Sequence, residues 1–184
     1  MHEQFKSRTE GVGSELHRFR TRGEALNFIS TFLQDEGTMN APGSYAVWVP
    51  GRFLTGIDTA RLSAKIPGLS FSVNRETAAD SLIGISDMDW ALADTGSLVA
   101  DQTAVEQRLA STLPAIHIAI IGTDRILADK AAVFTKITPA TSRYIAFITG
   151  PSRTADIERV LTIGVHGPKR LVIVLVDAME GVAP

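Results

Sequence analysis

Hydrophobic and polar positions change their period along the first part of the chain. Residues 14–20 alternate between polar and apolar side chains, which predicts a β-strand. The apolar residues that follow recur at helical spacing until Gly37 ends the pattern, so a helix is expected there. Its apolar positions are Ala25, Leu26, Ile29, Phe32 and Leu33. Residues 1–13 are polar and predict a loosely packed arm or a short helix.

Two apolar runs predict further strands before the middle of the chain. Residues 45–49 precede Pro50 and Gly51, and residues 69–73 precede Asn74, a residue type that commonly caps the start of a helix. We therefore expect a short helix after each of these strands.

The second half shows a clearer alternation of strands and helices. Residues 90–100 predict a hairpin that turns at Thr95 and Gly96, and residues 103–113 predict a helix that ends before Pro114. Apolar runs then predict strands at 116–121, 143–149 and 171–176, with helices at 124–137 and 154–163 between them. Continuous apolar strands separated by helices indicate a mainly parallel sheet covered on both faces. The expected fold class is α/β.

A corner rich in glycine, proline and hydroxyl residues lies at the predicted junction of strand and helix near residue 150. Gly150 permits unusual backbone angles, and Ser152 or Thr154 can cap free amide groups at the helix start, where the macrodipole is positive. Arg153 adds a fork of donors. Ligands of parallel sheets bind beyond the carboxyl ends of the strands, and this corner is expected at such an end. It is a candidate site for a phosphate or a carboxylate.

An ordinary capped helix is the alternative interpretation of this corner. Asp156 and Glu158 fall in the first predicted turn, where acidic residues are favoured by the helix dipole and offset the positive potential. A second corner, residues 164–168, places His166 and Gly167 just before the last predicted strand. His166 can act as an acid, a base or a hydrogen-bond donor near neutral pH, or it can only support the loop. Two corners flanking one helix suggest a site.

Asp94 and His117 are two further candidates. Asp94 precedes the Thr95–Gly96 turn with Ser97 across the hairpin, so it can present a carboxylate as nucleophile or base; ordinary turn chemistry is the alternative. His117 lies within an apolar run, which favours a hydrogen-bonded histidine of the core or of the site edge over a catalyst.

Asp87 and Asp89 stand two positions apart, as in some sites for hard metal ions. No further acidic cluster and no pair of histidines at helical spacing accompanies them. We therefore expect no tight metal site.

Composition limits the classes of function. The chain has 184 residues and 45% hydrophobic content, enough for one domain over residues 14–184. A net charge of -2 does not favour binding to nucleic acid or to an anionic membrane, and the apolar runs are too short to span a bilayer. We expect a soluble, cytoplasmic protein. The chain has no cysteine, so a thiol nucleophile or a cysteine-ligated iron–sulfur cluster within it is excluded.

Four motifs occur together in the second half of the chain. They are residues 93–99 (ADTGSLV), 113–118 (LPAIHI), 149–158 (TGPSRTADIE) and 164–168 (GVHGP). Together they resemble the lactate-utilisation protein C family, whose module is called the LUD domain. The four motifs follow the family order over residues 82–177, whereas the first half resembles it mainly in layout.

The resemblance implies a three-layer α/β/α domain similar to ribose-5-phosphate isomerase, glucosamine-6-phosphate deaminase and coenzyme A transferases. It also implies participation in the oxidation of L-lactate to pyruvate beside iron–sulfur partner subunits, which would hold the clusters while this chain holds no cofactor. The hairpin acid is usually glutamate in the family, but Asp94 is one methylene shorter, which puts its reach in doubt.

Our leading hypothesis is an accessory subunit of a lactate-oxidising system that binds a small anionic metabolite or its iron–sulfur partners. Asp94 and His166 are the candidate catalytic residues. The candidate ligand contacts are Thr95, Gly96, Ser97, His117, Gly150, Ser152, Arg153, Thr154 and Gly167. The alternatives are an enzyme that processes acyl groups or phosphosugars, with Asp94 as nucleophile or base, and a regulatory module that senses a metabolite.

Overall fold

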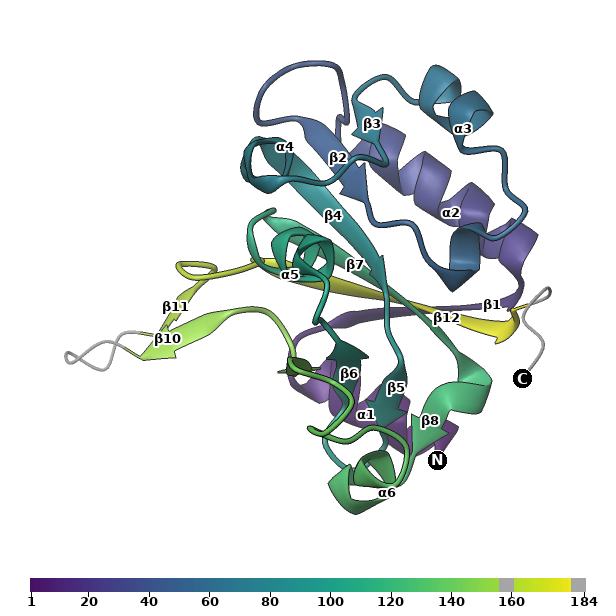
Figure 1. The fold of residues 1–184 in the computed structure, drawn as a ribbon, viewed down its shortest axis with the longest axis vertical. Coiled ribbons are helices and arrows are strands. Elements are labelled where there is room, and N and C mark those ends of the chain that lie inside the picture. Colours follow the sequence, from purple (N-terminus) through teal and green to yellow (C-terminus); the bar gives the residue numbers. More distant parts are fainter. Residues whose placement is uncertain (156–160, 180–184) are drawn as a thin grey trace.

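The computed structural model describes residues 1–155 and 161–179, and a six-stranded parallel sheet forms its centre (Figure 1). The strand order is β1-β12-β7-β4-β2-β3. The bounds are β1 Glu15–Thr21, β2 Tyr45–Trp48, β3 Leu69–Ser70, β4 Ser81–Asp87, β7 Ile116–Gly122 and β12 Arg170–Ala178. Every adjacent pair in this sheet is parallel, which confirms the predicted α/β class.

Helices cover both faces of this sheet (Figure 1). Helices α2 (Arg22–Asp35) and α3 (Thr59–Lys65) pack on one face, together with the 3₁₀ helix η1 (Arg52–Leu54). On the other face lie α1 (His2–Gly11), α4 (Arg75–Ala79) and α5 (Val105–Thr112). None of the helices in the described ranges is long and apolar enough to cross a membrane.

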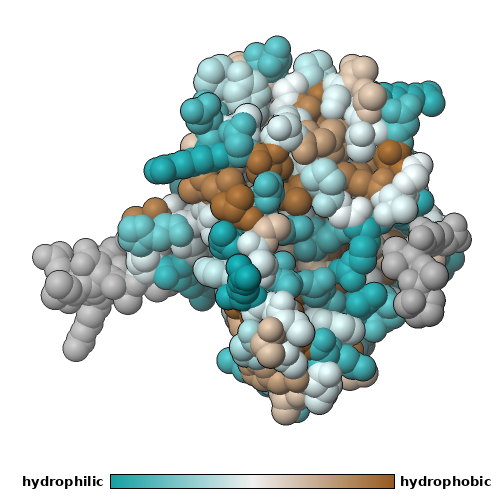
Figure 2. All heavy atoms as spheres, in the orientation of Figure 1, coloured by the Kyte–Doolittle hydropathy of each residue, from teal (hydrophilic) through white to brown (hydrophobic). Residues whose placement is uncertain are grey.

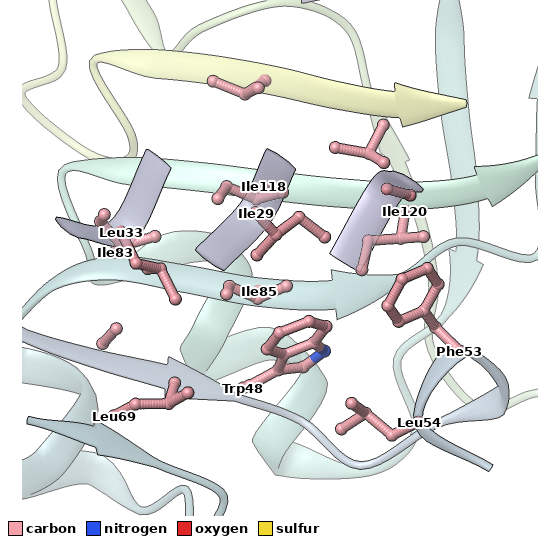
Figure 3. Close-up of a cluster of buried hydrophobic side chains, with 14 of the residues drawn as sticks. Ile29, Leu33, Trp48, Phe53, Leu54, Leu69, Ile83, Ile85, Ile118 and Ile120 are labelled. Carbon is pink, nitrogen blue, oxygen red and sulfur yellow. The ribbon is translucent and has the colours of Figure 1, made fainter. Parts of the chain in front are cut away.

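The strands supply both hydrophobic cores by strict alternation of their side chains. Along β7, Ile118 and Ile120 point into the core under α2, whereas Ala119 and Ile121 point into the core on the opposite face. Figure 3 shows Ile29 of α2 packed over the isoleucines of β4 and β7. A strand apolar on both faces is buried on both faces, so the sheet forms the middle layer.

Local signals set the helix starts as the sequence indicates. Thr21 and Glu24 form a capping box at the start of α2, in which the Glu24 amide donates to Thr21 Oγ1 at 3.2 Å. Asn74 caps α4 by accepting from the Thr77 amide at 2.9 Å, which confirms its predicted role. The strand predicted at 69–73 is shorter, because only Leu69 and Ser70 pair with β2.

The first residues form a packed helix, which is the second of the two expected forms. Phe5 of α1 is fully buried in the core on that face, beside Leu98 and Leu171. A hydrophobic anchor fixes the segment, so it is not a loose arm.

A second sheet of four strands lies beside the first, in the order β8-β5-β6-β9. The bounds are β5 Trp90–Leu92, β6 Ser97–Asp101, β8 Ile126–Leu127 and β9 Ile145–Ile148. Strands β5 and β6 form the predicted hairpin, and Gly96 in its turn has a φ of 71°. The predicted strand at 143–149 exists as β9, but it pairs antiparallel with β6 in this smaller sheet.

Two predicted helices are wrong. Residues 124–137 form the 3₁₀ helix η2 (Thr123–Arg125), strand β8 and the short helix α6 (Lys130–Phe134), because β8 pairs with β5 and Asp129 caps a new helix. In place of the helix at 154–163, β10 (Arg153–Ala155) and β11 (Leu161–Ile163) form an antiparallel ribbon. Positions 156 and 158, expected in that helix, lie outside the described residues.

The sequence pattern also missed a central strand, β4. Its apolar run is interrupted by Gly84 and Ser86. The structure explains the glycine: a Cβ at residue 84 would lie 1.9 Å from the Ala110 carbonyl oxygen of α5. The interruption therefore reflects close packing of a helix on the strand.

Candidate functional site

The corner at residues 149–153 packs against the end of α1. Gly150 has a φ of 74°, and a Cβ there would lie 2.7 Å from the Val12 carbonyl oxygen. The Arg153 guanidinium donates to the same Val12 oxygen. No helix starts at Thr154, because β10 replaces the predicted helix and Thr154 lies in this strand, so anion binding at this corner stays a prediction without the helix that motivated it. The observed contacts of Gly150 and Arg153 join the ribbon to the N-terminal helix.

Hydroxyl groups from the β5–β6 turn meet the same corner. Ser97 Oγ lies 2.6 Å from Thr149 Oγ1 and donates to Thr95 Oγ1 at 2.8 Å. Gly96 packs so closely on α1 that a Cβ would come 2.6 Å from the Thr9 amide nitrogen. Asp94 is exposed in this turn, and its amide donates to the Ala128 oxygen at 3.2 Å. The structure thus brings the hairpin turn and the first corner together.

The second corner contacts the first through Ser152. The Ser152 amide donates to the Pro168 oxygen and the Gly164 amide donates to the Ser152 oxygen, both at 2.9 Å. A Cβ at Gly167 would lie 3.0 Å from the Ser152 Cβ. His166 is exposed beside an open hollow of about 470 Å³ that Leu113 also lines. Asp94 and His166 therefore occupy different surroundings, the turn beside Ala128 and the loop beside Leu113.

Both corners lie at the amino ends of the parallel strands, which corrects the expected position. The Lys169 amide, just before β12, donates to the Ala115 oxygen, just before β7, at 2.7 Å. Pro168 and Val12, which contact the first corner, lie in the segments that lead into β12 (from Arg170) and β1 (from Glu15). The expected position was wrong because residues 143–149 were assigned to the parallel sheet. A strand of that sheet would have placed the corner at the carboxyl ends of the parallel strands.

His117 is fully buried in β7, as the apolar run around it indicates. Its Nε2 lies 2.9 Å from Ser86 Oγ on β4. Burial lowers the pKa of His117 to about 4, so the ring is neutral at physiological pH. Nδ1 has no hydrogen-bond partner within the described part of the chain.

A different crevice opens at the carboxyl ends of β2 and β4. The chain leaves β2 toward β3 through α3 on one face and leaves β4 toward β7 through α5 on the other. Neighbouring strands with diverging connections form a topological switch point, where open α/β sheets bind their ligands. The crevice encloses about 390 Å³. Its lining is Gly51, Arg52, Asp87, Asp89, Asp101, Thr103, Ala104 and Gln107.

Asp87, at the end of β4, is the most unusual group in this crevice. Its side chain is buried, and Oδ2 accepts from the Phe53 amide at 2.9 Å. Oδ1 has no donor among the described residues. Desolvation by burial raises the pKa of Asp87 above its ordinary value, against the lowering effects of the Phe53 amide and the Arg52 charge. Gly51 permits this arrangement, because a Cβ there would lie 2.5 Å from Asp87 Oδ2.

Arg52 and two further aspartates form the rest of the polar lining. Arg52 donates to the Met88 carbonyl oxygen at 2.5 Å and lies 3.4 Å from Asp89 Oδ1. Asp89 Oδ2 accepts from the Asp101 amide at 2.8 Å, which ties the loop after β4 to the end of β6. The Thr103 hydroxyl lowers the pKa of Asp101, which therefore stays ionised.

The crevice offers more acceptors than donors. Besides Asp87 Oδ1, the Gln107 Oε1 atom is buried without a partner in the described structure. A buried acceptor without a donor is costly, so these two atoms favour a ligand that brings hydroxyl groups. Arg52 can meanwhile bind one carboxylate. No group of three or more histidine, aspartate or glutamate side chains in the described ranges is arranged to hold a metal ion.

The sequence contained a signal for this site that could not be placed without the fold. Asp87 ends β4 and Asp89 follows it, and Gly51 and Arg52 follow β2, so both pairs stand at strand ends. Because β4 was not predicted, nothing in the sequence brought these loops together. Gln107 gave no signal, since it is one polar residue on a helix.

A family model and similar proteins of known name point to the same family. The LUD domain model matches residues 2–176. Lactate utilization protein C of Macrococcus caseolyticus is 30% identical over 181 residues, covering 84% of this chain and 75% of that protein. Lactate utilization protein C 1 of Bacillus mycoides is 34% identical over 113 residues, covering 54% of this chain and 44% of that protein. The aligned part thus ranges from under half to three quarters of these two relatives.

A solved structure shares the fold. A DUF162 family protein from Deinococcus radiodurans superposes with a TM-score of 0.64, covers 95% of each chain and is 19% identical. At this identity the likeness establishes the architecture alone.

Proposed function

This chain belongs to the LUD domain family, and from that premise we propose that it serves in L-lactate utilisation and binds a small 2-hydroxy carboxylate in the crevice between β2 and β4. The support for the pathway is that relatives aligned over large parts of this chain are named lactate utilization protein C. The support for the site is its position at the switch point of the sheet.

The observation that carries the ligand class is the pairing of one cation with unpartnered buried acceptors. Arg52 is the one basic side chain in the lining and can bind a single carboxylate. Asp87 Oδ1 or Gln107 Oε1 can accept the one hydrogen bond that a ligand hydroxyl group donates. A 2-hydroxy acid such as L-lactate carries both groups on neighbouring carbons.

The same lining disfavours polyanions. Asp89 and Asp101 accompany Arg52, so a diphosphate or a nucleotide would meet stronger repulsion than a singly charged ligand. This argues against a phosphosugar or coenzyme A substrate in this crevice.

Asp87 has a defined task in this proposal. Its raised pKa makes it a better proton acceptor than an exposed aspartate, so it can hold the proton of the ligand hydroxyl when that hydroxyl is oxidised. The chain has no cysteine for a cluster. Oxidation of a 2-hydroxy acid also removes the hydrogen on C2 together with an electron pair. We therefore propose that this hydrogen and the two electrons pass to a two-electron acceptor held by the iron–sulfur partner subunits, and that this chain supplies the binding site.

Complementation of a strain lacking this gene tests the proposal. Wild-type protein should restore growth on L-lactate, while Asp87→Asn and Arg52→Gln should fail although both proteins accumulate. The matched controls Asp80→Asn and Arg61→Gln change exposed residues outside the crevice and should restore growth. Full growth with both crevice variants would refute the site, and a deletion strain without a lactate defect would refute the pathway.

The partner proposal has a separate test. Affinity-tagged chain purified without oxygen from lactate-grown cells should bring down proteins that contain iron and acid-labile sulfide. Purification of the chain alone at every salt concentration would contradict the proposed binding of iron–sulfur partners. It would not affect the proposal for the ligand.

A further inference from the structure

The free edge of the smaller sheet combines an unpaired strand with exposed aromatic residues. Strand β9 is last in the order β8-β5-β6-β9, and within the described residues only β6 pairs with it. Phe134, Tyr144 and Phe147 beside this edge are 47%, 51% and 36% exposed. In the lower part of the molecule, where Figure 1 labels α6, Figure 2 shows apolar atoms (tan to brown) among hydrophilic ones (teal). Exposed edge strands are templates for pairing with another chain.

The pairing pattern shows which backbone groups of β9 are available. The Gln102 amide donates to the Tyr144 oxygen at 2.8 Å, and residues 100 and 98 pair with 146 and 148 in the same register. Hydrogen-bonded and non-hydrogen-bonded pairs alternate along an antiparallel ladder. The N–H and C=O groups of Ile145 and Phe147 therefore point away from β6, toward the free edge.

Basic residues predominate in the segment that contains this edge. Residues 130–155 contain Lys130, Lys136, Arg143 and Arg153 and no acidic residue, while Asp129 directly precedes the segment and Asp101 pairs with Ile145. Lys130 lies over the Phe147 ring at 5.3 Å, and Arg108 lies over the Tyr144 ring at 4.9 Å. The two aromatic residues thus carry cations at their faces.

We propose that the free edge of β9 binds an extended acidic segment of a partner protein as an added antiparallel or parallel strand. The backbone groups of Ile145 and Phe147 pair with the segment, its apolar side chains pack on Phe134 and Phe147, and its acidic side chains face Lys130, Lys136 and Arg143. A second copy of this chain does not fit, because pairing two β9 edges would bring the same basic residues together. This inference is independent of the lactate site.

The test uses a synthetic probe and the full chain. The probe is acetyl-Asp-Val-Glu-Val-Asp-Val-Glu-amide, compared with the same peptide carrying lysine at every acidic position. The acidic peptide should slow amide hydrogen exchange at Ile145 and Phe147 at least tenfold at saturation and bind more weakly as salt rises. The lysine peptide should bind at least tenfold more weakly.

Charge reversal supplies the decisive comparison. The double variant Lys136→Glu/Arg143→Glu should weaken binding of the acidic peptide at least tenfold, whereas the control Arg61→Glu/Lys65→Glu on α3 should change it less than twofold. All four positions are exposed, so the fold tolerates the changes.

Several results would overturn the inference. These are unchanged exchange at Ile145 and Phe147, equal binding of the two peptides, or equal effects of the two double variants. Dimerisation of the chain through β9, or tighter β9-dependent binding of an oligonucleotide or of anionic vesicles, would assign the edge to another occupant and would equally reject an acidic protein segment.

Discussion

Asp87 is the crevice residue whose burial disfavours its own charge. It is a buried carboxyl with one oxygen bonded to the Phe53 amide and the other without a donor in the described structure. Functional groups of this kind persist although they lower stability, because the ligand needs them.

Asp87→Asn should therefore stabilise the free protein while it abolishes ligand binding. The folded pKa of Asp87 is raised, so the folded state holds its proton more tightly than the unfolded state, and wild-type stability falls as pH rises through the window above pH 3.8. The amide side chain of the variant does not titrate, so it does not lower stability as the pH rises. We expect a higher Tm at pH 7, by about 2–4 °C for each ~1 kcal/mol released.

Thermal unfolding at pH 7 and near pH 3.5 measures this gain. The difference between Asp87→Asn and wild type should shrink at the lower pH, where both side chains are neutral. The control Asp80→Asn should show no comparable gain. A variant less stable than wild type at pH 7 would contradict a strained carboxyl.

His117 predicts a pH dependence of the opposite sign, in which stability is lost on acidification. Its pKa is 6.5 in the unfolded chain and about 4 in the folded one, so unfolding takes up a proton between these values. Stability is fully present above pH 6.5 and should fall by up to about 3 kcal/mol on acidification to pH 4. Urea unfolding of wild type and His117→Gln at pH 7 and pH 5 isolates this effect. Parallel pH profiles for the two proteins would show that His117 does not titrate as proposed.

At the scale of elements, the packing of α5 on β4 depends on Gly84. A methyl group there would meet the Ala110 carbonyl oxygen, a backbone atom that cannot rotate away. Gly84→Ala should thus push α5 outward and cost about 1–3 kcal/mol or more in the free energy of unfolding. Because Gln107 lies on α5, ligand affinity should fall as well.

Gly11→Ala is the matched control for this packing prediction. Nothing lies within 4 Å of a Cβ at Gly11, so the same chemical change should leave stability unchanged or slightly raised. Equal unfolding free energies for Gly84→Ala and wild type in urea would show that α5 shifts without cost.

Elements with a regular period could be predicted from the sequence, and those set by pairing could not. Strand β7 is apolar apart from His117, β12 contains the apolar run 171–176, and α2 has both a helical stripe and a cap. The ribbon of β10 and β11 was predicted as a helix because hydrogen bonding between strands leaves no periodic trace in such short segments. Strand β4 was not predicted because Gly84, which lets α5 pack closely on the strand, interrupts its apolar run.

At the scale of the molecule, the sheet topology separates the two ends of the parallel strands. The conspicuous glycine and proline corners lie at the amino ends, where Gly150, Arg153 and Ser152 join neighbouring segments. The crevice lies at the carboxyl ends, and its residues come from four separate stretches of sequence. The corners could be recognised in the sequence because their residues are contiguous. The crevice could not, because its residues come together only when β2 and β4 pair.

The central claim is that the crevice between β2 and β4, and not the corners, binds the ligand. The most direct measurement is a titration of the ¹⁵N-labelled full chain with L-lactate, followed by backbone amide shifts. Saturable shifts should appear at Gly51, Arg52, Asp89 and Gln107, and Arg52→Gln should weaken them at least tenfold. Shifts confined to Gly150, Ser152 and Gly167, or crevice shifts unchanged by Arg52→Gln, would contradict the account.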